Sequence, residues 1–402
     1  MTAPPPPKTV LVLGASRYQL EAIHAARRLG YRVVTTDNVP ANPGHALADR
    51  SYAVDTVDRE RVLEIAAREQ VAGVIAVATD VGVPTVAYVT ERLGLPGPPH
   101  AAARALCDKL RMRALLRGYG LPAPEWHLVT AGCRPAANQL SGRCWVLKPD
   151  RSSGAKGVRI IEDPDELDES LPGALAFSPS GAAILEHFIS GHQGTCEGVI
   201  EDGEIVLAFF LDRQTARPPF VTTSGHRVPT RLSASLQLEL LRQLTVLWRG
   251  LGVRQGPFDC DFVATEREVF LLDISPRVGG NSIARLLRRS AGFDIVEYAV
   301  RRACGDPYAL PQTVEVRPAA IVIFGVDRAG VLAYDERAAE ALAAEPWVAH
   351  LELDVPPGAA VQPFVNSRHR LGEALAVADS RFGADARATE LERRLNVRVS
   401  VP

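Results

Sequence analysis

The fold of this chain is decided by the stretch Pro257-Phe-Asp-Cys-Asp-Phe-Val-Ala-Thr-Glu-Arg-Glu-Val-Phe-Leu-Leu-Asp-Ile-Ser-Pro-Arg-Val-Gly-Gly-Asn281. Two short apolar runs flank the polar residues 265–268, and this pattern predicts a β-hairpin. Folding the stretch about these residues places Asp261 opposite Asp273, or one residue away from it. We therefore expect two carboxylates to face each other across a strand pair.

The carboxylates of this hairpin need a partner. Like charges opposite each other on neighbouring strands repel, and a carboxylate inside an apolar run is costly to bury unpaired. Because side chains alternate along a strand, Asp259 lies on the face of Asp261, and Ser275 lies on the face of Asp273. A hard cation such as Mg²⁺, which takes one or two carboxylates together with substrate phosphates, removes both costs. The alternative is an ordinary hairpin with exposed acids.

Length and composition narrow the class of protein. The 402 residues suit two or three packed units, and 47% hydrophobic with 23% charged residues is ordinary for a globular protein. The net charge of −2 gives no electrostatic case for nucleic acid or an anionic membrane. No apolar run approaches the roughly 18–20 residues of a membrane span. Residues 1–7 are expected to form a disordered Pro-rich leader. The six cysteines lack the spacing of a zinc site, and such scattered thiols suit a reducing cytoplasm.

Residues 8–100 have the pattern of a small doubly wound unit. Strands are expected at 9–13, 31–36, 51–54 and 73–78, and helices at 18–29, 58–69 and 84–93. Such alternation predicts a parallel sheet. Gly14-Ala-Ser16 followed by Asp37 partly fits a dinucleotide-binding turn, but Ser16 and Gln19 stand where glycines are needed. The helix start could equally hold a substrate carboxylate.

Three polar residues interrupt apolar segments in the middle of the chain. A helix expected over 101–117 carries Lys109, an apolar strand contains Lys148, and Glu186 lies in the apolar strand 182–189. The loop 150–157, Asp-Arg-Ser-Ser-Gly-Ala-Lys-Gly, could be a mobile cover whose N–H groups close on phosphates. It is not a Walker A motif, and the alternative is a solvated hairpin tip with a snorkelling Lys148.

The rest of the chain adds candidate contacts and a third unit. Arg213 and His226 are expected in polar loops, although a lone histidine is more often structural than functional. Further strands are expected at 195–200 and 205–211, with an amphipathic helix at 232–251. After the hairpin, Arg277 supplies a cation suited to phosphate, and one helix is expected from Asn281 to about Ala303. Residues 314–402 predict an α+β unit with a strand at 319–326 and helices at 335–344 and 384–394.

Taken in order, these motifs resemble those of the ATP-grasp superfamily of carboxylate–amine ligases, over nearly the whole chain. The resemblance is greatest to the branch that holds biotin carboxylase, the purine-pathway carboxylate ligases and the L-amino-acid ligases. It rests on Lys109, Lys148 before a Ser/Gly/Lys loop, Leu-Glu186-His-Phe-Ile-Ser-Gly191 and the acid hairpin. It implies an α/β and α+β ATP-grasp fold: a leader at 1–7, a Rossmann-like unit at 8–100, an ATP-grasp domain at 101–313 with a lid at about 140–190, and a small C-terminal α+β unit at 314–402.

The resemblance also implies the site residues, with ATP and Mg²⁺ (or Mn²⁺) as cofactors. Lys148 and Arg277 would act in catalysis. ATP would be bound by Lys109, Lys148, Ser152, Ser153, Gly154, Lys156, Gly157, Glu186, Phe188, Ile189 and Gln193. The metal would be held by Asp261, Asp273 and Ser275, although the family usually has Glu and Asn at the last two positions. Substrates would contact Ser16, Arg17, Arg213, His226, Gly279, Gly280 and Asn281.

The implied reaction is phosphoryl transfer from ATP to a substrate carboxylate, followed by attack of an amine on the acyl phosphate. The leading hypothesis is a cytoplasmic ligase that joins amino acids or a related small acid and amine, with a homodimer as one expected assembly. A bicarbonate-using carboxylase of the same fold is an alternative. A nicotinamide-dependent oxidoreductase and a nucleotide-binding protein without turnover are alternatives from other classes.

Overall fold

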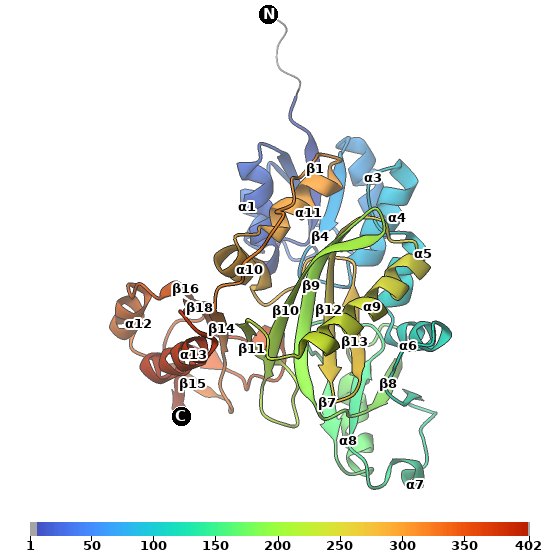
Figure 1. The fold of residues 1–402 in the computed structure, drawn as a ribbon, viewed down its shortest axis with the longest axis vertical. Helices are drawn as coiled ribbons and strands as arrows, with labels where there is room; N and C mark the ends of the chain where they lie inside the picture. Colours follow the sequence, from blue (N-terminus) through green and yellow to red (C-terminus); the bar gives the residue numbers. More distant parts are fainter. Residues whose placement is uncertain (1–5, 401–402) are drawn as a thin grey trace, which may run out of the picture.

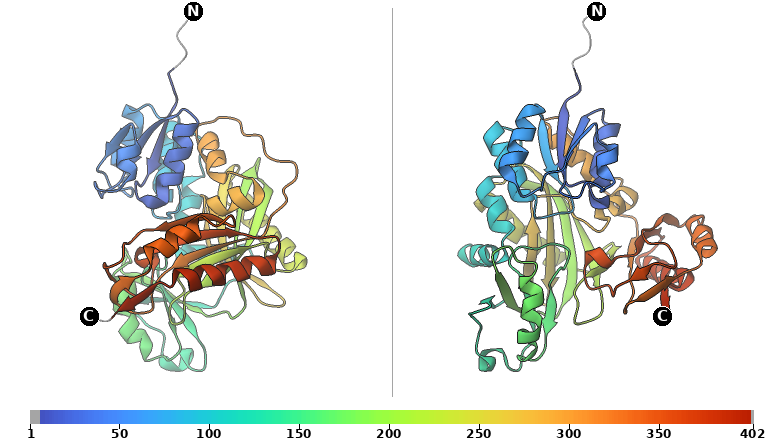
Figure 2. Two further views of the ribbon diagram at one scale, coloured as in Figure 1. Left: turned by 90° about the vertical axis from the view of Figure 1, so that its left-hand side faces the viewer. Right: turned by 180° about the vertical axis from the view of Figure 1, so that it is seen from behind.

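The computed structural model describes residues 6–400, and residues 1–5 of the expected leader lie outside them. Figure 1 shows three regions: an N-terminal unit in blue at one end, a lid unit in green at the other, and a C-terminal unit in red at the side. The central sheet runs between them, and the two further views in Figure 2 confirm this arrangement. Within the described residues, no helix has both the length and the apolar character needed to cross a membrane.

The N-terminal unit is the doubly wound parallel unit that the sequence predicts. Its strands are paired in the order β3-β2-β1-β4. Val10 and Val12 pack on one face of the sheet, where helices α1 and α11 (Ile295–Ala303) cover them, and Leu11 and Leu13 pack on the other face with α3 and α4. The elements are β1 Thr9–Leu13, η1 Arg17–Gln19, α1 Leu20–Arg28, β2 Arg32–Thr36, α2 Gly44–Leu47, β3 Arg50–Tyr52, α3 Arg59–Arg68, β4 Gly73–Ala76 and α4 Val83–Leu93.

The helix expected over 101–117 is two helices, so that prediction was wrong in detail. α5 (His100–Leu106) ends at Cys107, and α6 (Lys109–Gly118) begins after Asp108, whose carboxylate accepts the N–H of Arg111 at 3.1 Å. Asp108 is a good N-cap residue because its side chain satisfies an unpaired N–H of the first turn. The break places Lys109 at the first position of α6.

The lid unit is a four-stranded sheet in the order β5-β8-β6-β7 with two helices. Its core contains Trp145, Leu147 and Leu185, all almost fully buried. Lys148 lies on β6 and Glu186 on the neighbouring strand β8, so both side chains start from one rigid layer. The elements are β5 Trp126–Thr130, α7 Ala137–Leu140, β6 Trp145–Pro149, β7 Arg159–Ile161, α8 Glu166–Leu175 and β8 Ala182–His187.

The central sheet has eight strands in the order β13-β12-β9-β10-β11-β14-β18-β16. The predicted hairpin is present: β12 (Gly256–Ala264) pairs with β13 (Val269–Ser275), and Asp261 is directly opposite Asp273, as Asp259 is opposite Ser275. β9 (His192–Glu201) and β10 (Glu204–Thr215) continue the sheet, and α9 (Ala234–Gly250) covers it.

Two predictions about this region were wrong. Arg213 and His226 are not in loops but lie opposite each other on β10 and β11 (Thr223–Val228). Polar residues can occur on these strands because their side chains line a cavity. The helix after the hairpin is also two helices, α10 (Ile283–Ala291) and α11 (Ile295–Ala303). Gly292 ends the first with a φ of +66°, and Asp294 caps the second.

The C-terminal unit shares its sheet with the centre of the molecule. β14 (Ala319–Phe324) pairs with β11, and β18 (Gly372–Val377) and β16 (Val348–Leu353) extend the same sheet. A separate three-stranded sheet has the order β17-β15-β19. The remaining elements are β15 Gly330–Ala333, α12 Glu336–Ala343, β17 Ala360–Val361, η2 Ser367–His369, α13 Arg381–Leu395 and β19 Arg398–Ser400.

Candidate active site

A cavity of about 870 Å³ lies where the N-terminal unit, the lid unit, the central sheet and the C-terminal unit meet. Nearly all predicted site residues line it. These are Ser16, Arg17, Lys109, Lys148, Ser152, Ser153, Gly154, Lys156, Glu186, Phe188, Ile189, Gln193, Arg213, His226, Asp261, Asp273, Ser275, Arg277, Gly280 and Asn281. Gly157 and Gly279 do not line it. The cavity is at the upper end of the range of small-molecule sites, about 300–1,000 Å³.

Lysine is concentrated at this cavity. The chain has four lysines among its 45 basic residues, and Lys109, Lys148 and Lys156 line the cavity. A lysine ammonium is a compact point charge with three donors, whereas arginine is a planar fork. The chain uses arginine at almost every other basic position, so the three lysines give this cavity compact point charges of a kind that suits small oxyanions.

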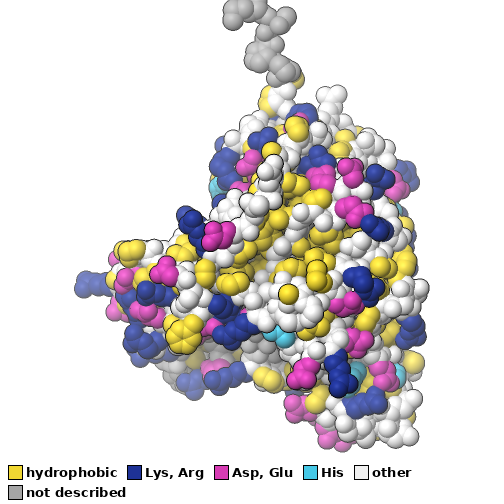
Figure 3. Space-filling view, viewed as in Figure 1, with side chains coloured by type: hydrophobic (Ala, Val, Ile, Leu, Met, Phe, Trp, Pro, Cys, Tyr) yellow, Lys and Arg dark blue, Asp and Glu magenta, His cyan; other side chains and the backbone are white. Residues whose placement is uncertain are grey.

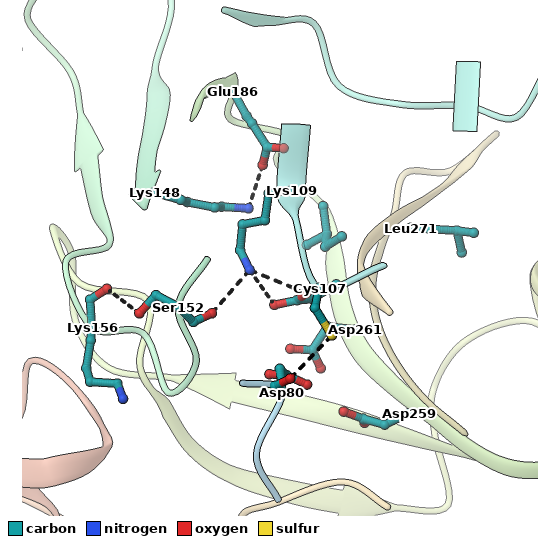
Figure 4. A network of polar contacts seen from close by, with 12 residues as sticks. Asp80, Cys107, Lys109, Lys148, Ser152, Lys156, Glu186, Asp259, Asp261 and Leu271 are labelled. Carbon is teal, nitrogen blue, oxygen red and sulfur yellow. Dashed lines mark hydrogen bonds and ion pairs between the residues drawn. The ribbon is translucent and has the colours of Figure 1, made fainter. Parts of the chain in front are cut away.

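Glu186 joins two cations inside the protein. It is almost fully buried, and its two carboxylate oxygens accept Arg113 Nε and Lys148 Nζ, each at 2.5 Å. Burial alone would raise the pKa of Glu186, but the charges of Arg113 and Lys148 outweigh it and lower this pKa to about 2. Figure 4 shows Lys148 and Glu186 above Lys109, which lies between them and the acids of the hairpin. The anion that Lys148 requires is therefore present within the fold, and each oxygen of Glu186 keeps a free lone pair for a ligand.

Arg113 was missed by the sequence analysis. It lies on α6, its side chain is fully buried, and Nη1 and Nη2 donate to the carbonyls of Leu271 and Leu272 at 3.0 and 2.8 Å. The guanidinium thus ties Glu186 of the lid unit to the strand that carries Asp273. The signal was available, since Arg113 follows Lys109 by four residues and therefore lies on the same face of a helix.

The backbone after Glu186 is partly occupied. The N–H of Phe188 donates to the carbonyl of Cys144 at 2.8 Å. The carbonyl of Phe188 is therefore the backbone group of this residue that is left to pair with a ligand, and ATP binding by Phe188 stays a prediction. Ile189 and Gln193 line the cavity, as expected.

The acid pair of the hairpin has the donor set of a cation site. Because Asp261 and Asp273 are directly opposite each other, they project from the same face of the sheet. Thr195 Oγ1 donates to Asp261 at 2.6 Å, and Lys109 Nζ lies 3.2 Å from Asp273. Lys109 remains charged because Asp273 and Asp80 raise its pKa against the effect of burial. Two carboxylates beside lysines suited to phosphate fit a hard cation that bridges protein and phosphate.

Arg277 bridges the N-terminal unit and the hairpin. Its Nε and Nη2 donate to Asp80 at 2.9 and 2.5 Å, and its Nη1 donates to Asp259 at 2.6 Å. Burial raises the pKa of Asp80, but Arg277 and Lys109 outweigh that effect and lower it. The pKa of Asp259 is raised to about 7, mainly by burial. The charge of Arg277 lowers this pKa, and the charges of Asp261 and Asp80 raise it. Asp80 was also missed, although it follows the carboxyl end of β4, where ligands of parallel sheets bind.

The turn after Arg277 differs from the prediction. The N–H of Gly279 donates to the fully buried Glu197 at 2.8 Å, so it is not available to a substrate carboxylate. A side chain at Gly279 would collide with Glu197, because its Cβ would lie 2.4 Å from the carboxylate. Asn281 has a left-handed φ of +52°, and the helix begins only at Ile283. Glu197 itself was missed, although an acid inside an apolar strand is the same signal that singled out Glu186.

His226 is a buried histidine directed at the cavity. It is 1% exposed, and neither ring nitrogen has a hydrogen-bond partner within the described residues. Burial lowers its pKa to about 3, with Arg213 and Arg227 adding to the effect and Asp261 opposing it. The imidazole is therefore neutral near pH 7 and can offer one donor and one acceptor to a ligand.

The N-terminal turn does not have the geometry of a dinucleotide site. Asp37 accepts the N–H of Ala15 and that of Val39, each at 2.8 Å, so its carboxylate is held by the turn itself. The Gln19 side chain lies over Gly14, where its atoms come within 2.9 Å of the position of an added Cβ. That side chain fills the space that a pyrophosphate would need, which disfavours the nicotinamide hypothesis.

Comparison with known proteins agrees with this geometry. Three family models match: an ATP-grasp N-terminal domain at residues 23–97, an ATP-grasp domain at 142–285, and the L-amino acid ligase C-terminal domain 2 at 322–400. A D-alanine–D-alanine ligase from Delftia acidovorans is 31% identical over 52% of this chain and 67% of its own length. Carnosine synthase 1 of Gallus gallus is 27% identical over 76% of this chain and 36% of its own length.

A solved structure extends the likeness to the whole fold. The L-amino acid ligase of Bacillus licheniformis superposes with a TM-score of 0.82 at 19% identity, covering 99% of this chain and all of that one. Enzymes of this superfamily use ATP with Mg²⁺. From the matched models, the related ligase and the shared fold, the chain belongs to the ATP-grasp superfamily, among its carboxylate–amine ligases.

Proposed function

We propose that this protein joins the carboxyl group of one amino acid, or of a closely related small acid, to the amino group of another, forming ADP and phosphate. The match of residues 322–400 to the L-amino acid ligase C-terminal domain supports this choice, and so does the similarity to carnosine synthase 1. The observation that carries the proposal is the single cavity in which Lys148, Glu186 and the acid pair of the hairpin meet. Its volume leaves room for small substrates beside a nucleotide.

The first step in this proposal is attack of a carboxylate oxygen on the γ-phosphorus, with loss of ADP. Lys109 and Lys148 hold the phosphates, and Asp261 and Asp273, with Ser275 beside them, would hold Mg²⁺. When bound, the metal ion would neutralise charge on the phosphoryl group. Such a reaction depends on this neutralisation more than on covalent catalysis by the protein. Glu186 orients Lys148 and offers an acceptor to the adenine amino group.

In the second step the amine nitrogen attacks the acyl carbon, the carbon–oxygen bond to phosphate breaks, and phosphate leaves with the proton that the nitrogen loses. Arg277 lies at the junction of the N-terminal unit and the hairpin. There its guanidinium would stabilise the negative charge on the acyl phosphate. The neutral His226 and the side chain of Arg213 also line the cavity and offer hydrogen-bonding groups for the polar parts of the substrates. Ser16, Arg17, Gly280 and Asn281 complete this end of the cavity.

The proposal is tested by measuring ADP formation with MgATP and all pairs of a panel of amino acids, with products identified by mass spectrometry. We expect ADP only when both an acid and an amine are present, and a dipeptide of the corresponding mass. Lys148→Met should abolish this activity, whereas Lys8→Met, which removes an exposed lysine paired with Asp306, should retain it. ADP formed with bicarbonate alone, or AMP instead of ADP, would contradict the proposal.

We further propose that the enzyme acts in a reducing compartment such as the cytoplasm and forms a homodimer. All six cysteines are free thiols, which suits such a compartment. Figure 3 shows hydrophobic side chains gathered near the middle of one face, with charged side chains around them. The mass in solution from light scattering checks the dimer, and a monomer at micromolar concentration would rule it out.

A further inference from the structure

The turn that precedes α10 has a backbone conformation that its residue types do not favour. Asn281 and Ser282 both have left-handed φ values, of +52° and +58°, and neither is a glycine. A left-handed backbone brings the Cβ of such a residue close to a carbonyl oxygen, so it persists only where the surroundings hold it. Because Asn281 lines the cavity, whatever holds this turn also determines the shape of the substrate end.

The contact that holds the turn comes from the C-terminal unit. The hydroxyl of Ser282 donates to the carboxylate of Glu373 on β18, and Arg285 of α10 donates to the same carboxylate at 3.4 Å. Glu373 is 3% exposed. Since β18 pairs with β14 on one side and β16 on the other, the carboxylate has a fixed place in the sheet. The turn is therefore anchored to a buried strand 91 positions away along the chain.

Arg370 joins this carboxylate to a second segment of the cavity wall. Its Nη1 donates to Glu373 at 2.7 Å and its Nε donates to Asp354 at 2.8 Å. Asp354 also forms an ion pair with Arg17 of the N-terminal unit. Burial lowers the pKa of Arg370, but Glu373 and Asp354 outweigh this effect and raise it, so the guanidinium stays charged. One buried guanidinium thus links the loop that carries Arg17 to the turn that carries Ser282.

We propose that Glu373 and Arg370 are positioning residues, which hold the 280–282 turn and the 16–17 loop at the spacing that the substrate acid or amine requires. This role rests on the proposed function, because both segments line the cavity as expected substrate contacts. Glu373 does not line the cavity, so it acts through the turn. At the nucleotide end, Lys148 is held by Glu186 instead. Loss of the anchor should therefore weaken substrate binding and leave MgATP binding unchanged.

Two substitutions of Ser282 separate the anchoring contact from the backbone conformation. Ser282→Ala removes the hydroxyl and keeps a Cβ, so the left-handed conformation loses its support. We expect the KM for the amino acid substrates to rise about tenfold, as for loss of a hydrogen bond to a charged group, while the KM for ATP stays unchanged. Ser282→Gly also removes the hydroxyl, but glycine adopts a left-handed φ without steric cost. Its KM should therefore lie closer to that of the wild type.

Hydrogen exchange of the unliganded full-length protein provides a measurement that needs no turnover. The N–H of Ile283 donates to the carbonyl of Gly280 at 3.1 Å, and this bond closes the turn. In Ser282→Ala we expect this amide to exchange about tenfold faster than in the wild type. The matched control is Ser233→Ala, which removes the serine that caps α9 by accepting the N–H of Leu236 at 3.4 Å. It should leave the exchange of the turn and both KM values as in the wild type.

A pair of variants tests the buried side of the anchor. Glu373→Gln keeps an oxygen that can accept from Ser282 but loses the charge that pairs with Arg370, whereas Glu373→Ala loses both. We expect the KM for the amino acid substrates to rise less in Glu373→Gln than in Glu373→Ala. If these two variants fail to fold, the Ser282 variants, which leave the ion pairs of Glu373 intact, still decide the question.

Each of three results would overturn the positioning role. The first is an unchanged KM for the amino acid substrates in Ser282→Ala. The second is a KM in Ser282→Gly that is raised as much as in Ser282→Ala. The third is wild-type exchange of the Ile283 amide in Ser282→Ala. Faster exchange in Ser282→Ala, in a protein whose wild type forms no dipeptide, would refute the proposed ligation while supporting the anchor.

Discussion

Replacement of Arg113 by methionine tests whether this buried guanidinium couples Glu186 to the metal hairpin. The wild-type side chain donates to Glu186 at 2.5 Å and to the carbonyls of Leu271 and Leu272 at 3.0 and 2.8 Å. Methionine retains an apolar stem but has no guanidinium and no charge, so Glu186 keeps only Lys148 as a counter-ion. Loss of one partner of a buried ion pair costs about 3–5 kcal/mol. Because Lys148 remains, we expect a loss of about 3 kcal/mol, at the lower end of that range.

The same substitution should weaken nucleotide binding. Lys148 must then neutralise Glu186 alone, so its ammonium is less available to a phosphate. We expect the affinity for MgATP to fall about tenfold, equivalent to about 1.4 kcal/mol. Urea unfolding followed by tryptophan fluorescence measures the stability change, and isothermal titration with a non-hydrolysable analogue measures the affinity.

A control and a double mutant decide whether the reasoning holds. Arg117→Met removes an exposed arginine of the same helix that lies 5.8 Å from the Trp126 ring, and it should cost less than about 1 kcal/mol. The double mutant Arg113→Met with Glu186→Gln should be more stable than the sum of the single effects, because the partners Arg113 and Glu186 are removed together and only Lys148 loses its counter-ion. A loss below 1 kcal/mol in Arg113→Met, or simple additivity with Glu186→Gln, would refute the coupling.

Three further predictions concern the hairpin, the arginine bridge and the buried histidine. Asp273→Asn should lower ADP formation about 100-fold, and a metal titration should show partial recovery at high Mg²⁺ or Mn²⁺. The control Glu266→Gln, in the hairpin turn, should have no effect. A loss of activity that does not depend on metal concentration would contradict the metal role of Asp273. Asp80→Asn leaves Arg277 with Asp259 as its acidic partner and should lower kcat about 100-fold, because the guanidinium is misplaced. The KM for ATP should change little. A change in this KM without a change in kcat would contradict the proposed role of the arginine bridge. The pKa of His226 is about 3 in the folded protein and 6.5 as its ordinary value. As the pH falls below about 6.5, the unfolded chain therefore binds a proton at this histidine before the folded chain does. The contribution of His226 to stability falls between pH 6.5 and pH 3 by about 1.4 kcal/mol per pH unit. His226→Gln should reduce the slope of unfolding free energy against pH in that window, and identical slopes for both proteins would exclude this assignment.

The hairpin could be predicted from the sequence because alternation and a polar turn determine which residues face each other. Asp261 and Asp273 are opposite for this reason. The doubly wound unit could be predicted because apolar strands such as Thr9–Leu13 and Gly73–Ala76 alternate with segments of helical periodicity. These are local patterns, and the physical rules that link them to structure act over a few residues.

Contacts between distant segments could not be predicted in the same way. Asp80 and Arg277 are 197 positions apart, and Arg113 and Glu186 are 73 apart. No periodicity encodes such pairs. Arg213 and His226 were placed in loops because polar residues usually face solvent, whereas here the polar face of two strands lines a cavity. The break before Lys109 was predictable in principle, since Asp108 is a strong N-cap residue.

The central claim is that the acid hairpin, Lys148 and the metal they imply serve phosphorylation of a substrate carboxylate. A substrate acid labelled with ¹⁸O in its carboxylate tests this most directly, because the oxygen that attacks ATP leaves with phosphate when the amine attacks the acyl carbon. Mass spectrometry of the released phosphate should show one ¹⁸O atom, formed only when the amine is present. Phosphate without the label, or label found in AMP, would contradict the account.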